Sequence, residues 1–278
     1  MEYYGILEKY ENQFDRLPIF FPSKVGGTPV WLDPSHTPDL NLIKCEGCKK
    51  TMTFFLQMYC PLSFPSAYHR TLFLFCCRSE DCCKNSNVTP FVVLRSNLPQ
   101  VNEYYGDDAD LDLTDEQAAR YCLNDQFPQK TWQISQLEEY ALIVKPIQRE
   151  ENDNLTNLER KLKYEQSERE LDELIQRIRN DESNHDSEFE SFVDSFADPY
   201  QKGKIKDDEV PICKICDQKY VYEFQVYPQI LNYTKFLNSK KNNFEMDFGT
   251  ILIYTCPNSC MEENGNYFKE FAWKQDIY

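Results

Sequence analysis

Histidine and glycine are scarce in this chain, and their scarcity argues against several classes of enzyme. Only three histidines are present among 278 residues, and His36, His69 and His185 lie in unrelated sequence contexts. The eight glycines form no Gly-rich phosphate loop, and neither a His-Glu-x-x-His sequence nor a nucleophile elbow is present. We therefore expect a protein that is not an enzyme.

Long apolar runs are also missing. The longest one, around Leu72 to Cys77, is far too short to span a bilayer. Charged residues interrupt the stretch from Met1 to Phe14, which therefore lacks the apolar core of a targeting signal. The expectation is a cytoplasmic protein without membrane contacts. Shuttling through the nucleus stays open, because leucine-rich spacing that is loosely typical of an export signal occurs at 171–178.

Negative charge dominates the chain, and it is concentrated in two stretches. The formal net charge is −16 and the pI is about 4.7. Residues 101–125 contain eight acidic and one basic residue, and residues 150–198 contain sixteen acidic and six basic residues. The rest of the chain is close to neutral. Such a distribution repels nucleic acid and favours a basic protein partner.

Cysteine is abundant, and its spacing repeats. Twelve cysteines in a chain without a secretory signal favour metal sites over disulfides, although buried thiols and disulfides remain alternatives. Eight residues separate Cys45-x-x-Cys48 from Gln57-x-Tyr59, and the same pattern recurs at one constant offset, ending in Gln225-x-Tyr227. Each copy then has an apolar run, a second cysteine pair and an aromatic strand.

The repeat predicts two metal sites with four thiolate ligands each. A CxxC pair and a second pair some tens of residues away are typical of structural zinc sites, which leave no open position for a catalytic water. Cys76 and Cys83 are plausible substitutes in the first site, and a redox role for the second CxxC is a weaker alternative. The predicted ligands of the two zinc ions are Cys45, Cys48, Cys77 and Cys82, and Cys213, Cys216, Cys256 and Cys260.

Strand patterns around these cysteines predict a mainly β fold with α insertions (α+β). We expect Met52, Phe54, Leu56 and Met58 to share one strand face, with Gln57 and Tyr59 opposite; Tyr220, Tyr222, Phe224 and Val226 would match them in the second copy. Val30 to Leu32 is predicted to be a short edge strand with Trp31 packed inward. The residues assigned structural roles are Gly26, Gly27, Pro29, Trp31, Gln57, Tyr59, Gln225, Tyr227 and Trp273.

The predicted organisation has three parts: a β-rich four-cysteine unit at 15–100, an acidic insertion at 101–200, and a second β-rich unit at 205–278. The insertion is expected to be partly helical or disordered, with a capping signal at Thr114–Gln117, a strand returning to the sheet near 137–145, and an amphipathic pattern at 155–178. It is either a solvated insertion or a docking segment. The candidate partner-binding residues are Asp107, Asp108, Asp110, Asp112, Phe189, Phe192 and Phe196.

Several of these sequences resemble the programmed cell death protein 2 family. The resemblance rests on Gly26–Leu32, on Leu56–Leu62 with Tyr68–Cys77, on Glu223–Tyr233, and on the terminal Glu270–Asp276. No Cys/His cluster lies between Asn97 and Lys206, so the chain looks like the shorter, "2-like" branch without the MYND-type zinc finger. Residues 197–201 run quickly into Val210, which makes the second unit shorter than the family pattern.

The resemblance implies a function in ribosome biogenesis. Members of this family are understood as dedicated chaperones that capture one basic protein of the small (40S) ribosomal subunit, which agrees with the acidic charge of this chain. The alternatives are a zinc-containing adaptor in cell proliferation or apoptosis signalling, and a zinc-dependent nucleic-acid binder, which would need a basic face.

Overall fold

The computed structural model describes residues 3–11, 13–85, 88–105, 137–146, 205–233, 246–262 and 265–276. The chain divides into two compact units, one formed by residue 1 with 146–204 and the other by 2–145 with 205–278. All described strands belong to the second unit, apart from the last residue of one strand. The helices expected at Thr114–Gln117 and 155–178 lie outside the described residues.

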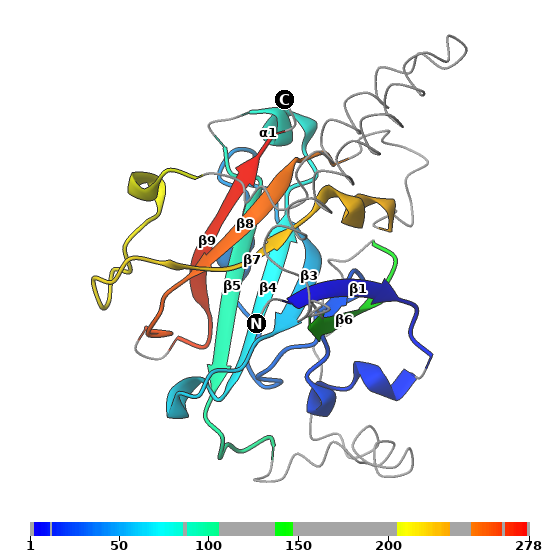
Figure 1. Cartoon of the computed structure of the whole chain (residues 1–278), viewed down its shortest axis with the longest axis vertical. Helices are drawn as coiled ribbons and strands as arrows, with labels where there is room; N and C mark the ends of the chain where they lie inside the picture. Colours follow the sequence, from blue (N-terminus) through cyan, green and yellow to red (C-terminus); the bar gives the residue numbers. More distant parts are fainter. Residues whose placement is uncertain are drawn as a thin grey trace, which may run out of the picture. The chain divides into compact units, whose positions relative to one another are not determined.

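Strands dominate the described chain, as predicted, and the helical elements are short (Figure 1). None of the described helices has the length and apolarity needed to cross a membrane. The strands are β1 (Tyr3–Glu8), β2 (Lys24–Val25), β3 (Thr53–Tyr59), β4 (His69–Cys76), β5 (Phe91–Leu98), β6 (Tyr140–Pro146), β7 (Val221–Val226), β8 (Thr250–Thr255) and β9 (Phe268–Gln275). The helices are α1 (Glu80–Lys84) and the 3-10 helices η1 (Gln13–Arg16), η2 (Pro18–Phe20), η3 (Leu40–Ile43), η4 (Pro65–Ala67), η5 (Asp207–Glu209) and η6 (Pro228–Asn232).

A single nine-stranded sheet contains both cysteine repeats. Its order is β1-β6-β2-β3-β4-β5-β9-β8-β7, and every neighbouring pair from β6 to β7 is antiparallel. We call residues 22–98 the first repeat and residues 205–276 the second repeat. They join where β5 pairs with β9, and the strand expected near 137–145 is β6, which pairs with β2.

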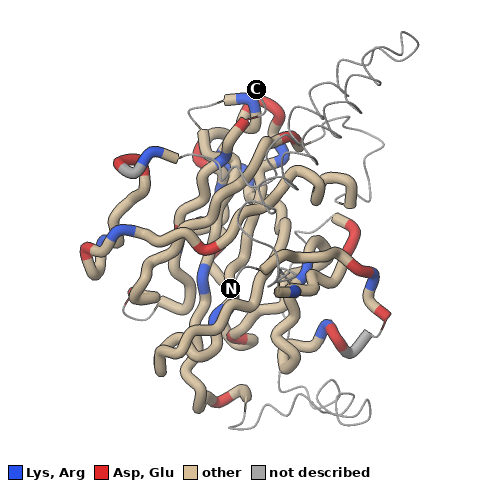
Figure 2. The backbone as a smooth tube through the Cα atoms, in the orientation of Figure 1, with Lys and Arg blue, Asp and Glu red and all other residues tan. Residues whose placement is uncertain are grey.

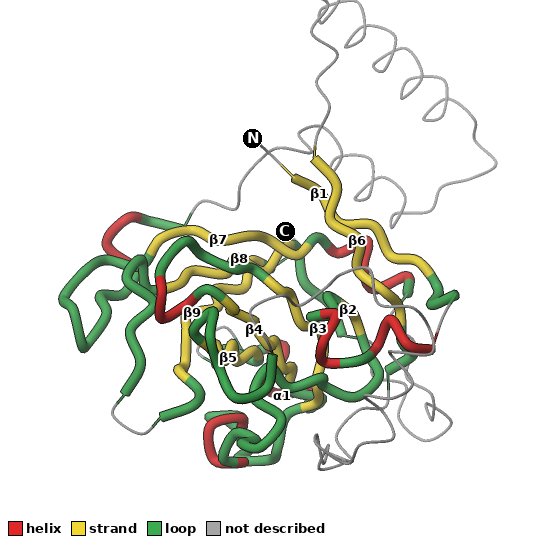
Figure 3. Tube along the Cα trace, turned by 90° about the horizontal axis from the view of Figure 1, so that it is seen from below, coloured by secondary structure: helices red, strands yellow, loops and turns green. Residues whose placement is uncertain are grey.

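The sheet curls, so that strands from the two repeats face each other across an apolar core (Figure 3). This core, which we call the inner core, includes Phe55 and Leu74 of the first repeat together with Ile251 and Ile253 of the second. A second core, which we call the outer core, lies on the other side of the first repeat and is built around Trp31. Because both faces of β4 are covered, all eight of its residues are buried, as expected for a strand rich in aromatic and aliphatic residues.

The predicted alternation along β3 and β7 is wrong, because both strands contain a β-bulge. The register shifts between Phe54 and Leu56 in β3, and between Tyr222 and Phe224 at the equivalent place in β7. One extra residue reverses the facing of all residues beyond it. Phe54 therefore lies in the outer core while Leu56 lies in the inner core.

The segment predicted as an edge strand at Val30–Leu32 is not a strand, and β2 lies earlier, at Lys24–Val25. The side chain of Gln57 takes the place of a neighbouring strand. It accepts a hydrogen bond from Val30 N–H (2.8 Å) and donates to the carbonyls of Pro22 (2.8 Å) and Val30 (3.2 Å). Trp31 does pack inward, with its ring 4.9 Å from that of Phe73.

Candidate metal centres and the arginine network beside them

Each CxxC sequence forms the same tight turn. In the first repeat, Cys45 N–H donates to Lys50 O and Lys49 N–H donates to Cys45 O, both at 2.9 Å. Lys49 has a φ of 60°, a left-handed conformation that lets the chain reverse just after the second cysteine. The second repeat has the same bonds, from Cys213 to Gln218 (2.8 Å) and from Asp217 to Cys213 (2.9 Å), with a φ of 54° at Asp217.

These turns bring the predicted ligands together in two groups of four. The sulfur atoms of Cys45, Cys48, Cys77 and Cys82 lie within 4.8 Å of one another, as do those of Cys213, Cys216, Cys256 and Cys260. The Sγ atoms of Cys48 and Cys77 are 3.6 Å apart, and so are those of Cys216 and Cys256. Such distances exceed a disulfide bond of about 2.0 Å. They suit a tetrahedral metal, since metal–sulfur bonds of about 2.3 Å place the sulfurs about 3.8 Å apart.

In each cluster, a backbone N–H group lowers the pKa of the second cysteine of the CxxC pair. A hydrogen bond from the backbone of Gln218 lowers the pKa of Cys216 to about 7, and Lys50 makes the equivalent bond to Cys48. Ser79 N–H donates to Cys77 Sγ at 3.4 Å. Burial raises the pKa of Cys77 and Cys82 in the first group and of Cys256 and Cys260 in the second. The four convergent sulfur atoms of each group fit a metal that prefers sulfur and binds it as thiolate, such as zinc or iron.

The structure separates the ligand candidates from their neighbours in the sequence. Cys77 follows the end of β4 and points to the first cluster, whereas Cys76 lies on the opposite face, in the inner core. Burial in this core raises the pKa of Cys76 to about 12. Cys83 donates from its Sγ to Cys77 O at 3.4 Å. Both belong to the packing around the site and not to the ligand group.

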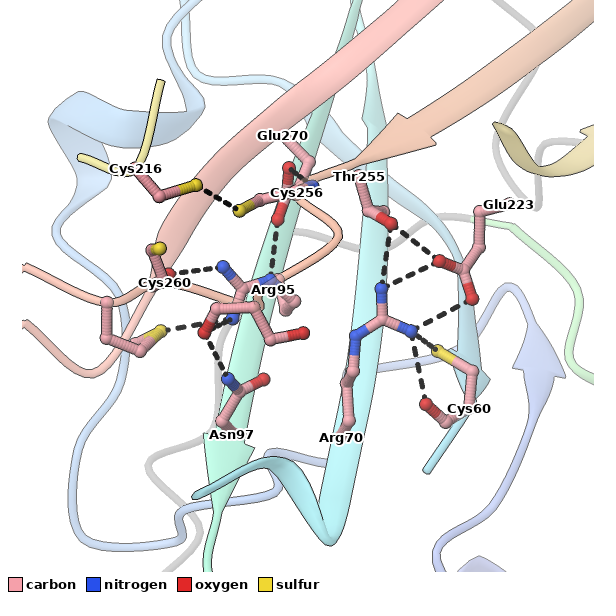
Figure 4. A network of polar contacts seen from close by, with 12 residues as sticks. Cys60, Arg70, Arg95, Asn97, Cys216, Glu223, Thr255, Cys256, Cys260 and Glu270 are labelled. Carbon is pink, nitrogen blue, oxygen red and sulfur yellow. Dashed lines mark hydrogen bonds and ion pairs between the residues drawn. The ribbon is translucent and has the colours of Figure 1, made fainter. Parts of the chain in front are cut away.

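Arg95 of β5 connects the first repeat to the second cysteine cluster (Figure 4). It is fully buried and forms an ion pair with Glu270, whose other carboxylate oxygen accepts Cys256 N–H at 3.0 Å. Arg95 also donates to the carbonyls of Ser259 (3.1 Å) and Cys260. Arg95 therefore binds both segments that carry predicted ligands: the segment of Cys256 through Glu270, and the segment of Cys260 through main-chain carbonyls.

Arg70 of β4 makes a second connection across the curl of the sheet (Figure 4). Its guanidinium binds both carboxylate oxygens of Glu223, at 2.9 and 2.7 Å, and donates to Thr255 Oγ1 at 2.9 Å. Burial alone would raise the pKa of Glu223, but the bonds from Arg70 and Thr255 hold it below its usual value. The carboxylate is thus ionised, and the pair joins β4 to β7.

The two repeats differ at the positions that make this network possible. Glu223 is the bulged residue of β7, and its equivalent in β3 is Phe55. Thr255 precedes Cys256 as Cys76 precedes Cys77. In the first repeat these positions are apolar and belong to the inner core; in the second they bind arginine. Sequence reasoning missed the network, although arginine in an otherwise apolar strand is itself a signal, because a buried charge needs a partner.

The remaining predicted residues have structural settings or fall outside the described chain. Tyr59 hydrogen-bonds His69 Nδ1 at 3.0 Å, and burial lowers the pKa of His69. Gly26 and Gly27 adopt φ values of 68° and 63°. Tyr227, in contrast to Tyr59, is 42% exposed. The partner-binding candidates Asp107, Asp108, Asp110, Asp112, Phe189, Phe192 and Phe196 lie outside the described residues.

Comparison with known proteins identifies the family of this chain. Residues 3–112 match the family model of the programmed cell death protein 2 N-terminal domain, and residues 110–276 match that of its C-terminal putative domain. The chain therefore belongs to the programmed cell death protein 2 family. No solved structure shows a significant match.

Similar curated proteins carry both names used within this family. Programmed cell death protein 2 of Bos taurus is 29% identical over 92% of this chain and 91% of its own length, and that of Mus musculus is 26% identical with the same coverage. Programmed cell death protein 2-like of Mus musculus is 25% identical over 87% of this chain and 86% of its own length. Assignment to the shorter branch stays a prediction.

Proposed function

We propose that this protein is a dedicated chaperone for a basic protein of the small ribosomal subunit, acting in the cytoplasm. The observation that carries the proposal is the concentration of negative charge in residues 101–125 and 150–198. In the described chain, by contrast, acidic and basic positions are interspersed (Figure 2). The β-sheet would serve as a rigid support for the acidic segments, which would neutralise a basic client and shield it from nucleic acid.

The metals in this proposal are two structural zinc ions. Four thiolates complete the coordination of zinc, so the metal would have no open position for water or substrate. The zinc ions would stabilise the CxxC turns that precede β3 and β7, and each site would contribute on the order of 10 kcal/mol to folding. The proposal therefore assigns no catalytic activity to the protein.

The client can be tested by affinity purification of the tagged full chain at about 50 and about 300 mM salt, after nuclease treatment. We expect a basic small-subunit ribosomal protein at low salt, and less of it at high salt. A variant carrying Asp→Asn at positions 107, 108, 110 and 112 keeps side-chain size and should recover less client. Failure to recover any ribosomal protein at either salt concentration would refute the proposal. Loss of all recovered protein after nuclease would instead favour a nucleic-acid binder.

A further inference from the structure

Among the described residues, one element of the first repeat has no counterpart in the second. In the first repeat, β2 pairs with the outer edge of β3, and the chain then continues over the sheet to Trp31. In the second repeat, β7 takes the position of β3 but is the last strand of the sheet. Among the described residues, nothing corresponds to β2 or to Trp31 there.

The missing element corresponds to a specific binding arrangement in the first repeat. Gln57, which is 1% exposed, holds the main chain at Val30 and Pro22 through three hydrogen bonds. Trp31 then covers the outer face of the sheet, 4.9 Å from Phe73 and 6.5 Å from Phe75 by ring centroids. Phe73 and Phe75 are fully buried as a result.

Gln225 is the equivalent of Gln57, and its carbonyl oxygen has no partner among the described residues. The Gln225 Oε1 atom is buried and accepts no hydrogen bond from them, a costly state that a backbone N–H could relieve. By register, Gln225 lies opposite Leu252, as Gln57 lies opposite Phe73. The side chain is therefore placed to hold an extended main chain in the way that Gln57 does.

Aromatic residues surround Gln225 on the same face of the sheet. Tyr222 packs against Tyr254, and Tyr254 against Phe271. Tyr222 is 39% exposed, whereas its equivalent Phe54 is 0% exposed under the cover of the first repeat. A partly exposed aromatic face beside a buried amide oxygen without a partner in the described chain is typical of a surface that binds another chain.

We propose that this face binds an extended segment of a partner protein, which adds to the edge of β7 and pairs its main chain with the Gln225 amide. A bulky apolar side chain of the partner would lie on the aromatic residues, as Trp31 does on the first repeat. The sequence at the matching place differs from that of the first repeat. At the constant offset of the repeat, Trp31 corresponds to Pro199, and residues 180–212 contain no tryptophan and one glycine.

The proposed surface goes beyond the chaperone function and does not depend on the identity of its client. Its occupant is defined by chemistry: an extended backbone followed by a large apolar residue. The first repeat supplies a natural probe, the peptide of residues 22–34, which contains one lysine and one aspartate. Because it is neutral, its binding would not reflect attraction to the acidic segments.

The test is fluorescence anisotropy of the labelled 22–34 peptide titrated with the full chain. We expect saturable binding, and we expect Gln225→Ala to weaken it about tenfold, since two lost hydrogen bonds correspond to roughly that factor. A peptide carrying Trp31→Ala should also bind more weakly. Gln229→Ala is the matched control, because Gln229 is exposed in η6 outside the aromatic face, and this variant should bind like the wild type.

Three results would overturn the proposal. The first is absence of binding to the wild-type chain, and the second is equal affinity for the wild type and Gln225→Ala. The third is binding that appears only when residues 187–204 are replaced by a flexible linker of equal length, which would mean that this chain covers its own surface. None of these results bears on the recovery of a ribosomal protein, so the two proposals fail independently.

Discussion

The two equivalent glutamines should respond in opposite ways to the same substitution. Gln57 is buried and makes three hydrogen bonds to main-chain atoms of residues 22 and 30. At about 0.5–1.5 kcal/mol for each bond, Gln57→Ala should lower the free energy of unfolding by about 2–4 kcal/mol. The loss would also leave Val30 N–H without its partner and loosen the cover that Trp31 provides.

Gln225→Ala removes an oxygen that has no hydrogen-bond partner within the described part of the chain. We therefore expect the free energy of unfolding to change by less than about 1 kcal/mol in either direction, since no bond is lost and an unfavourable burial is relieved. Because the residue type, the strand position and the substitution are the same, the difference between the variants reports the bound segment alone.

Urea unfolding followed by tryptophan fluorescence would measure both variants, with zinc and reductant held constant because metal binding is coupled to folding. An unchanged m-value would show that both variants expose the same surface area on unfolding as the wild type. Equal destabilisation of the two variants would refute the reasoning, because it would mean that Gln225 already holds a segment as Gln57 does.

Four further substitutions, one of them a control, test the site and the sheet. Cys216→Ala should lose about one equivalent of zinc in elemental analysis, whereas Cys76→Ala should retain both; equal metal content would contradict the ligand assignment. Gly26→Ala should destabilise by more than about 1 kcal/mol in urea unfolding, because its φ is 68° and a Cβ would lie 2.0 Å from Glu138 O; stability equal to wild type would exclude this close approach. Glu223→Gln should lower stability at neutral pH by about 3–5 kcal/mol, because it leaves Arg70 buried without its anion. Since the folded pKa of Glu223 lies below its usual value, this stabilisation is present above the usual carboxyl pKa and is lost as the pH falls through the lowered one. The difference in free energy of unfolding between variant and wild type should therefore become smaller at acid pH. A difference that stays constant with pH would argue against the ion pair.

The repeated cysteine spacing determined much of the candidate site by itself. CxxC turns depend on local backbone geometry, so the same spacing produces the same hydrogen bonds at Cys45 and at Cys213. Alignment of the two copies also selected Cys77 over Cys76, because adjacent residues at the end of a strand face opposite sides. These properties are local, and a sequence pattern can report them.

Only the tertiary structure decided how the two repeats meet. Arg70 binds Glu223 from 153 residues away, and Arg95 binds Glu270 from 175 residues away; no local pattern records such pairs. The β-bulges reversed the predicted faces of the residues beyond them in β3 and β7. The sequence did not reveal the bulges, because one inserted residue leaves the apolar composition of a strand unchanged. Gln57 and Gln225 look alike in the sequence. They differ in that residues 22–31 cover Gln57, whereas no described segment covers Gln225 in the same way, and this depends on packing between distant parts of the chain.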